Sequence, residues 1–392
     1  MTSTVVDLLA ELVSIASVNA GMAEGPGERE IAERVAALGR VLGAEVSLDE
    51  VLPGRPNVLV RLPSTESVGA RTGRRLLFDV HLDTVPLASM PDALTPRIAD
   101  GRMWGRGACD TKASLAAALV ALERVARLGG RRSGEVCLLG TVDEEYQKAG
   151  AAHAVARGLT ADAAIVGEPT ALQPVIAHKG AVRWRMTARG RAAHTSRPES
   201  GNNAIYQMVE VIRALRERLE PRLGGETHPL LTPPTLTIGT IQGGVGVNVV
   251  PDSCTIAVDR RTLPREDPEA VLAEVDALMA DLMAARPDIH VTREAPFLSE
   301  RGLETPTDAP VVQAVQAACR AVLGPRASVE PGGVPYGTDG THLSPAGIPT
   351  VVLGPGDIAQ AHSADEWVEL AQVERAAEIY FRLMRGFVQG EW

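Results

Sequence analysis

Apolar residues recur with two different periods along the chain, and their alternation predicts an α/β fold. From Glu28 to Leu42 they stand three and four positions apart, which is typical of one helix face, and Gly43 ends the pattern. A second helix is predicted over Lys112–Leu128. Short apolar runs typical of buried strands lie at Val58–Leu62, Arg75–Val80, Glu135–Thr141 and Ala163–Val166. Strands that alternate with helices predict a mainly parallel sheet.

From about residue 177 a different order of elements begins. Strand, helix, strand, strand, helix and strand patterns follow at Ala181–Ala188, Asn203–Leu219, Thr235–Ile241, Cys254–Arg261, Pro268–Ala285 and Ile289–Arg293. This β-α-β-β-α-β order is the ferredoxin-like motif. A helix over Ala309–Leu323 and a strand over Pro349–Leu353 then resume the α/β pattern of the first 176 residues. We therefore expect an α/β domain of residues 1–176 plus 295–392, interrupted by a smaller domain of residues 177–294.

The composition indicates a soluble, cytoplasmic protein that binds neither nucleic acid nor membranes. Lys and Arg number 39 against 49 Asp and Glu, so the chain lacks the cationic excess of a phosphate-binding surface. The longest apolar run, Leu115–Leu122, is far short of the roughly 20 residues of a membrane span. Met1–Val13 predicts an amphipathic helix instead of a signal peptide, and the polar stretch Pro63–Arg74 predicts an exposed loop. The four cysteines lie far apart, which indicates reduced thiols.

Acidic and imidazole side chains follow the predicted strands at the points where the strands end, and one more precedes the helix that begins at Lys112. In chain order they are His81, Asp83, Asp110, Glu144, Glu145, Glu168 and His362. Ligand sites of open α/β sheets form at the carboxyl ends of the strands. We therefore expect these side chains to converge in space.

Divalent cations would explain this concentration of carboxylates, which otherwise repel one another and raise each other's pKa. Imidazole and carboxylate ligands without thiolates suit Zn²⁺, Co²⁺ or Mn²⁺, and a bridging carboxylate allows two ions about 3.5–4 Å apart. In His81-Leu82-Asp83 the carboxylate can hold the imidazole N–H that faces away from the metal. Of the adjacent Glu144 and Glu145, one can be a ligand while the other takes a proton from bound water.

Four segments resemble the M20 family of metallopeptidases and deacylases: Asp79–Pro86, Gly105–Lys112, Asp143–Glu145 and Gly167–Thr170. The similarity covers essentially the whole chain. It implies two metal ions, Zn²⁺ first among the alternatives, with His81, Asp110 and Glu168 on one ion and Asp110, Glu145 and His362 on the other. Asp110 would be the bridge. Glu144 would be the general base and later the proton donor to the leaving amine, while Asp83 would orient His81.

The resemblance also implies that the inserted domain is a lid and dimerisation domain. The segment Gly190–Ser196 resembles the family segment whose histidine reaches the active site of the partner subunit, so His194 would stabilise the oxyanion in a homodimer. Asn248 and Arg261 match lid positions that meet substrate, and a guanidinium suits a substrate α-carboxylate. The neighbouring Arg260 has the opposite strand parity.

The activity implied is hydrolysis of the amide bond of a small N-acyl amino acid or a short peptide. The segment Gly354–His362 most resembles the acetylornithine deacetylase branch of the family. The alternatives are the succinyl-diaminopimelate desuccinylase branch and a dipeptidase or carboxypeptidase. Tyr336–Gly340 departs from the pattern of the deacetylase and the desuccinylase. A catalytically silent binding protein on the same fold is the alternative outside enzymes, and loss of Glu144 or of a ligand would indicate it; none is lost.

Overall fold

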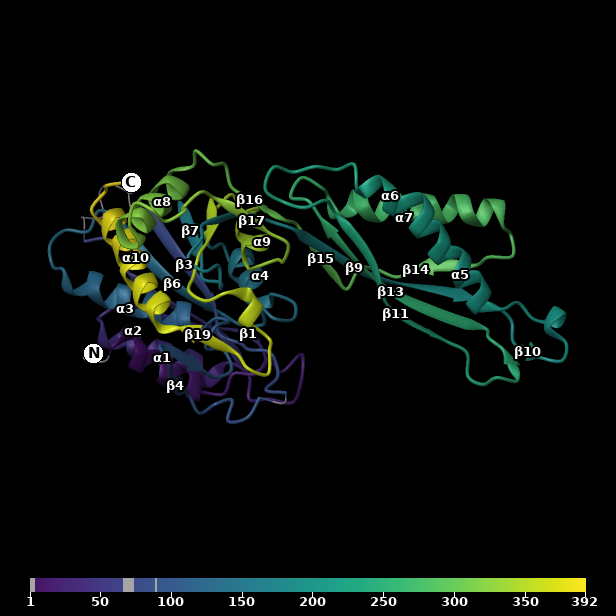
Figure 1. The fold of residues 1–392 in the computed structure, drawn as a ribbon, viewed down its shortest axis with the longest axis horizontal. Helices are drawn as coiled ribbons and strands as arrows, with labels where there is room; N and C mark the ends of the chain where they lie inside the picture. Colours follow the sequence, from purple (N-terminus) through teal and green to yellow (C-terminus); the bar gives the residue numbers. More distant parts are fainter. Residues whose placement is uncertain (1–3, 66–73, 89) are drawn as a thin grey trace. The chain divides into compact units, whose positions relative to one another are not determined.

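The computed structural model describes residues 4–65, 74–88 and 90–392 and divides into two compact units. Unit 1 contains Met1–Ile176, Glu304–Gly332 and Thr338–Trp392, and unit 2 contains Ala177–Leu303 and Gly333–Gly337 (Figure 1). The first three residues of the helix expected at the N-terminus, and most of the loop expected over residues 63–74, lie outside the described residues.

The second boundary of the inserted domain differs from the expected residue 294. Strand β15 (Leu298–Glu300) pairs antiparallel with β9 (Gly180–Arg189), so the chain stays in unit 2 as far as Leu303. Gly333–Gly337 also belongs to unit 2, so the chain enters this unit twice. A three-residue strand and a five-residue segment are too short to carry a periodic pattern.

Unit 1 is built on a mixed sheet with the strand order β1-β2-β6-β3-β7-β18-β8. The strands are β1 (Glu45–Leu52), β2 (Arg55–Leu62), β3 (Arg75–His81), β6 (Glu135–Thr141), β7 (Ala163–Val166), β8 (Val175–His178) and β18 (Thr350–Val352). The central strands β6, β3, β7 and β18 are parallel, whereas β1, β2 and β8 pair antiparallel at the two sides. The expectation of a mainly parallel sheet therefore holds only for its centre.

The central strands are buried along nearly their whole length, which means that both faces of the sheet are covered, because successive side chains point to opposite faces. The helices of unit 1 are α1 (Val5–Ser14), α2 (Arg29–Val41), α3 (Lys112–Arg127), α4 (Ala149–Ala156), α8 (Pro310–Leu323), α9 (Gly340–Leu343) and α10 (Leu370–Val388). Helices α3 and α10 pack against each other and against β6, while α2 packs on β1 and β2 (Figure 1). Among the described residues, none of the helices combines the length and apolar character that crossing a membrane requires.

A small antiparallel sheet, β19-β5-β4, ties the C-terminal part of unit 1 to the segment before α3. It consists of β4 (Arg97–Ala99), β5 (Arg102–Trp104) and β19 (Trp367–Glu369). Its strands also make cation–π contacts, with Arg97 at 3.9 Å from the Trp104 ring centroid and Arg102 at 3.8 Å from that of Trp367. This pairing brings residues 362–366 beside residues 105–110.

Unit 2 has the β-α-β-β-α-β order expected from the sequence, given by β9, α5 (Ala204–Ala214), β11 (Thr235–Gly243), β13 (Ser253–Thr262), α7 (Pro268–Ala285) and β14 (Val291–Arg293). The sheet order is β11-β13-β9-β14, and all pairs are antiparallel. The helix expected over Asn203–Leu219 begins at its cap Asn203 but changes to a π-turn at Leu215–Leu219, followed by α6 (Glu220–Leu223). The short elements β10 (Ala193–His194), β12 (Val249–Val250) and η1 (Pro198–Ser200) also belong to unit 2. Strands β16 (Leu303–Glu304) and β17 (Gly332–Val334) both pair with β8 in the large sheet, and η3 (Ile358–Gln360) lies in unit 1.

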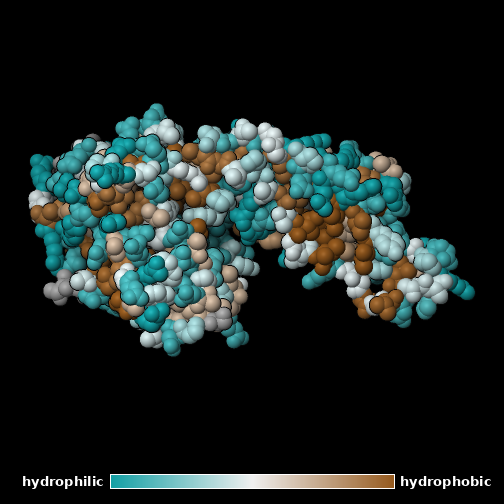
Figure 2. All heavy atoms as spheres, in the orientation of Figure 1, coloured by the Kyte–Doolittle hydropathy of each residue, from teal (hydrophilic) through white to brown (hydrophobic). Residues whose placement is uncertain are grey.

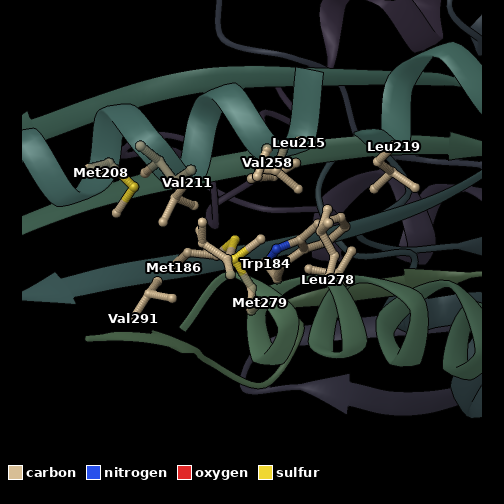
Figure 3. Packing of buried hydrophobic residues seen from close by; sticks show 14 of the residues in the cluster. Trp184, Met186, Met208, Val211, Leu215, Leu219, Val258, Leu278, Met279 and Val291 are labelled. Atoms are coloured by element: carbon tan, nitrogen blue, oxygen red, sulfur yellow. The ribbon is translucent and has the colours of Figure 1, made fainter. Parts of the chain in front are cut away.

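The core of unit 2 lies on one face of its sheet. Alternate residues of β9, among them Trp184 and Met186, are fully buried against Met208 and Val211 of α5 and Met279 of α7 (Figure 3). The intervening β9 residues face away from the helices, as the strand period of two requires. One sheet face is therefore covered by the helices, and the other carries polar side chains.

Candidate metal centre

Within unit 1 the structure brings together two groups of side chains that could each hold a metal ion. They are His81, Asp110 and Glu168 in one group, and Asp110, Glu145 and His362 in the other. The ligand atoms of each group all lie within 4.8 Å of one another, and Asp110 belongs to both. The groups have the same members as the two sets expected from the sequence, and metal ligation by them stays a prediction.

The sheet topology explains the convergence. Strands β6, β3 and β7 are parallel neighbours, so the residues that follow them emerge at the same edge of the sheet. The Thr111 hydroxyl donates a hydrogen bond to the carbonyl of Gly167 and thereby ties the loop of Asp110 to the loop of Glu168. His362 has a positive φ of 59°, an unfavourable backbone conformation for a non-glycine residue that is common at functional sites.

Asp110 presents one carboxylate oxygen to each imidazole. Its Oδ1 lies 3.0 Å from Nε2 of His81, and its Oδ2 lies 3.3 Å from Nε2 of His362. Glu168 Oε2 is 3.9 Å from the same nitrogen of His81, and Glu145 Oε1 is 3.0 Å from that of His362. The carboxylate of Asp110 therefore has the orientation that a bridge between two ions requires.

The electrostatics of this cluster fit two divalent cations. Burial, with the charge of Asp110 added, raises the pKa of Glu145 to about 8, and burial also raises the pKa of Glu168. Burial alone would raise the pKa of Asp110 as well, but the two imidazoles outweigh it and lower that pKa. The contacts with Asp110 and Glu145 in turn raise the pKa of His362 to about 10. Buried carboxylates here need positive charge, and oxygen and nitrogen donors without sulfur suit ions such as Zn²⁺.

Asp83 contacts His81 through its backbone oxygen and its carboxylate. Its backbone oxygen, at 3.0 Å, is nearer to Nδ1 of His81 than its carboxylate, at 3.6 Å. The carboxylate also accepts hydrogen bonds from the backbone N–H groups of Glu144 at 3.0 Å and Glu145 at 3.1 Å, and from Nδ2 of Asn19 at 2.7 Å. One residue therefore holds both the imidazole and the turn that follows β6.

The adjacent glutamates of this turn differ in their surroundings. Glu145 belongs to a ligand group, whereas Glu144 belongs to neither group among the described residues. Glu144 is 7 % exposed, and its Oε1 lies 3.5 Å from Nζ of Lys148. A buried carboxylate beside the cluster, outside the ligand groups, is the arrangement that general-base chemistry needs.

The other expected site residues belong to unit 2. His194 lies on β10 opposite Val249, its Nδ1 is 2.8 Å from Oγ of Ser196, and Asn248 accepts a hydrogen bond from the N–H of Thr195 at 3.2 Å. His194 and Asn248 are therefore close together within unit 2. Arg261 is half-buried on β13 and donates to Asp259, whereas Arg260 is buried and donates to Glu266.

Glu366 is a supporting residue that the sequence analysis missed. It is 1 % exposed, and its Oε1 accepts hydrogen bonds from the backbone N–H groups of Cys109 at 2.9 Å and Asp110 at 3.1 Å. Its Oε2 accepts from Nη1 of the buried Arg106 at 2.6 Å. In the sequence Glu366 stands among polar residues four positions after His362, and nothing local marks it, because its partners are more than 250 residues away.

The chain is similar in sequence to a known family and to curated proteins. The sequence pattern of peptidase family M20/M25/M40 matches residues 77–386. The chain is 34 % identical to an acetylornithine deacetylase of Myxococcus xanthus, over 82 % of this chain and 83 % of that protein. It is 32 % identical to an acetylornithine deacetylase of Proteus mirabilis, over 99 % of this chain and 98 % of that protein.

Solved structures share the fold. A tripeptidase of Staphylococcus aureus matches with a TM-score of 0.79 at 24 % identity, over 98 % of both chains. An M20 family metallo-carboxypeptidase of Sulfolobus solfataricus matches with a TM-score of 0.76 at 20 % identity, over 99 % of this chain and 100 % of that chain.

Substitution of Glu366 by Gln is expected to weaken metal binding about 10–100-fold, the usual effect of losing a partner that orients a ligand. The single amide oxygen of Gln can accept hydrogen bonds either from the two N–H groups or from Arg106. One of these sets of contacts is therefore lost, and we expect Asp110 to shift. Calorimetric titration of Zn²⁺ into chelator-treated protein measures the effect. Glu369→Gln, three residues on and exposed, is the control and should bind as the wild type does. Equal affinities for folded Glu366→Gln and wild type would contradict the role.

Proposed function

Since this chain belongs to peptidase family M20/M25/M40, we propose that it hydrolyses N-acyl amino acids in the manner of an acetylornithine deacetylase. The family makes it a metal-dependent hydrolase of amide bonds. The observation that carries the proposal is the geometry of Asp110, with one oxygen toward each of two imidazoles and the carboxylate of Glu144 beside them, outside both ligand groups. None of the proposed ligands is lost, nor is Glu144, which disfavours a silent binding protein.

In this proposal His81, Asp110 and Glu168 hold one divalent ion, and Asp110, Glu145 and His362 hold the second. Zn²⁺ is the first choice, with Co²⁺ and Mn²⁺ as alternatives, because the donors are nitrogen and oxygen only. Ions bound there would polarise the amide carbonyl and make a water more acidic. Asp83 keeps His81 in the orientation that directs Nε2 toward the cluster.

Glu144 is the general base of the proposed reaction. It takes a proton from the attacking water as the water oxygen bonds to the carbonyl carbon, and it delivers that proton to the nitrogen as the C–N bond breaks. The products are a carboxylic acid and a free amine. The hydrogen bond from the N–H of Glu144 to Asp83 fixes the backbone from which this carboxylate projects.

Unit 2 supplies the remaining groups in our proposal, as a lid and dimerisation domain. His194 donates a hydrogen bond to the developing oxyanion, and Arg261, with Asn248, binds the substrate α-carboxylate. Arg261 is the better candidate than Arg260, because Arg260 is buried and occupied by Glu266.

A homodimer is supported by the surface of unit 2. Large apolar side chains are exposed there at Tyr206, Val209, Ile241, Val245 and Val247. Figure 2 shows apolar side chains gathered on the face of unit 2 that it presents. Exposed apolar groups of this kind mark protein–protein interfaces.

The cysteines support a cytoplasmic location. All four, Cys109, Cys137, Cys254 and Cys319, are buried and unpaired. Unpaired thiols are typical of a reducing compartment. We therefore propose that the protein is located in the cytoplasm.

The proposal predicts release of a free amine from N-acetylornithine by chelator-treated protein reloaded with Zn²⁺ or Co²⁺. The panel should include other N-acetyl amino acids, N-succinyl-diaminopimelate and dipeptides, since these distinguish the deacetylase from the desuccinylase and peptidase alternatives. N-acetylornithine is expected to have the highest kcat/KM. Absence of hydrolysis across the whole panel with every metal would contradict the proposed function.

Glu144→Gln is expected to lower kcat by about 10²–10⁴-fold, because the amide cannot accept the proton. Its metal content should stay at the wild-type level, since Glu144 lies outside the ligand groups. The matched variant Glu145→Gln should lose metal instead. Metal analysis beside kinetics separates the two, and metal loss in Glu144→Gln alone would show that base and ligand are interchanged.

His194→Ala is expected to reduce kcat by about 10²–10³-fold, the usual loss of one oxyanion donor, without lowering the thermal stability of the protein. His194 is exposed on a short strand, so its removal leaves no cavity. If the residue acts across a dimer, mixtures of the His194→Ala and Glu144→Gln proteins should regain part of the activity. Verified heterodimers that stay inactive would place its action within one chain.

A further inference from the structure

The turn that carries Glu144 and Glu145 has its backbone held by carboxylates on two sides. Three successive N–H groups donate hydrogen bonds to buried side chains: that of Asp143 to Glu28 Oε1 at 3.2 Å, and those of Glu144 and Glu145 to Asp83. Asp83 is already part of the metal centre. Glu28 has no contact with either ligand group, so its role needs a separate explanation.

Glu28 is one half of a buried ion pair. Its Oε2 lies 2.6 Å from Nε of Arg55, and its Oε1 lies 2.5 Å from Nη2 of the same guanidinium. That Nη2 also donates to Oδ1 of Asp143 at 3.0 Å. Glu28 is fully buried, Arg55 is 7 % exposed and Asp143 is 2 % exposed. A guanidinium can make such a fork of contacts, whereas an ammonium cannot.

The backbone of Asp143 explains why the turn needs this support. Its φ is 70°, in the left-handed region that non-glycine residues rarely adopt. Its carbonyl accepts hydrogen bonds from the N–H groups of Gln147 at 3.1 Å and Lys148 at 2.6 Å. The path of the chain from β6 into Glu144 is therefore set at Asp143, and Arg55 and Glu28 hold Asp143 at both its side chain and its N–H.

We propose that the Arg55–Glu28 pair is a positioning device for the general base, which acts through Asp143 to fix the turn of Glu144 and Glu145. This inference rests on the proposed function of Glu144. Both residues of the pair precede residue 77, where the match to the family pattern begins. They come from the start of α2 and from β2, elements that contribute no ligand to the metal groups.

Arg55→Met is the direct test, with Arg61→Met as its matched control. Arg61 lies on the same strand and is also ion-paired, to Glu45 and Glu135, but it is half-exposed and has no contact with the turn. Arg55→Met is expected to lower kcat by about 10–100-fold, with KM changed less than kcat. Hydrogen–deuterium exchange of the full-length protein should become faster in the peptide of residues 142–148. Arg61→Met should match the wild type in both measurements.

A purely structural ion pair would give a different result. It would lower the melting temperature of Arg55→Met but leave kcat and the exchange of residues 142–148 unchanged at temperatures where the protein is folded, and this outcome would overturn the proposal. Arg55→Lys should restore part of kcat, because an ammonium can reach only some of the partners.

Asp143→Asn provides a second test in case Arg55→Met does not fold. The Arg55–Glu28 pair then remains neutral, and Asn tolerates a positive φ, so only the charged contact to the turn is lost. We expect kcat about 3–10-fold lower and faster exchange in the same peptide. Wild-type kinetics and exchange in Asp143→Asn would overturn the proposal.

The result also separates this inference from the proposed function. If the wild type hydrolyses no substrate, or if Glu144→Gln remains active, the proposed function fails while the exchange data still decide whether the pair holds the turn. If Glu144→Gln is inactive and Arg55→Met is not impaired, the positioning role alone fails.

Discussion

The structure depends on a concentration of buried carboxylates that must be kept close together at one edge of a sheet. Asp110, Glu168 and Glu145 would repel one another in the absence of balancing charge, and burial raises the pKa of both glutamates. Two imidazoles supply only part of that balance. Divalent cations bound as proposed would supply the rest, and the orientation of Asp110, with one oxygen toward each imidazole, follows from its position between His81 and His362.

A second layer of carboxylates surrounds the first and acts on the backbone. Glu366 accepts the N–H of Asp110, Asp83 accepts those of Glu144 and Glu145, and Glu28 accepts that of Asp143. Each has its own donor group, from Arg106, Asn19 and Arg55 respectively. The loops at the strand ends, which would otherwise be the most mobile part of such a sheet, are thereby fixed by charge-assisted hydrogen bonds. This outer layer therefore positions the side chains that are proposed to bind metal.

The sequence predicted the convergence of the inner layer, most elements and Asp83 of the outer layer, but not Glu28 and Glu366, and the reason is physical. His81, Asp110 and Glu168 stand next to strong helix and strand patterns, so their convergence follows from topology. Glu28 and Glu366 contact partners far along the chain, and in the sequence they look like ordinary polar positions. The predicted strand direction was wrong at the two sides of the sheet for a related reason. Antiparallel strands such as β1, whose residues are mostly exposed, have no local feature that sets their direction. The end of the insertion was missed because β15 is only three residues long.

The segment that returns to unit 1 is also held by a buried carboxyl group. Asp339, which follows the second segment of unit 2, accepts a hydrogen bond from the hydroxyl of Thr141 at 2.7 Å, and Thr141 is the last residue of β6 before the turn of Glu144 and Glu145. Thr141 also lies 3.3 Å from the carboxyl of Asp79, whose pKa burial raises to about 7. Both carboxyl groups are buried, and burial raises the pKa of Asp339 as well, which favours the neutral form of each group. The hydroxyl of Thr141 therefore fastens the returning segment to β6, the strand that leads into the turn of Glu144 and Glu145.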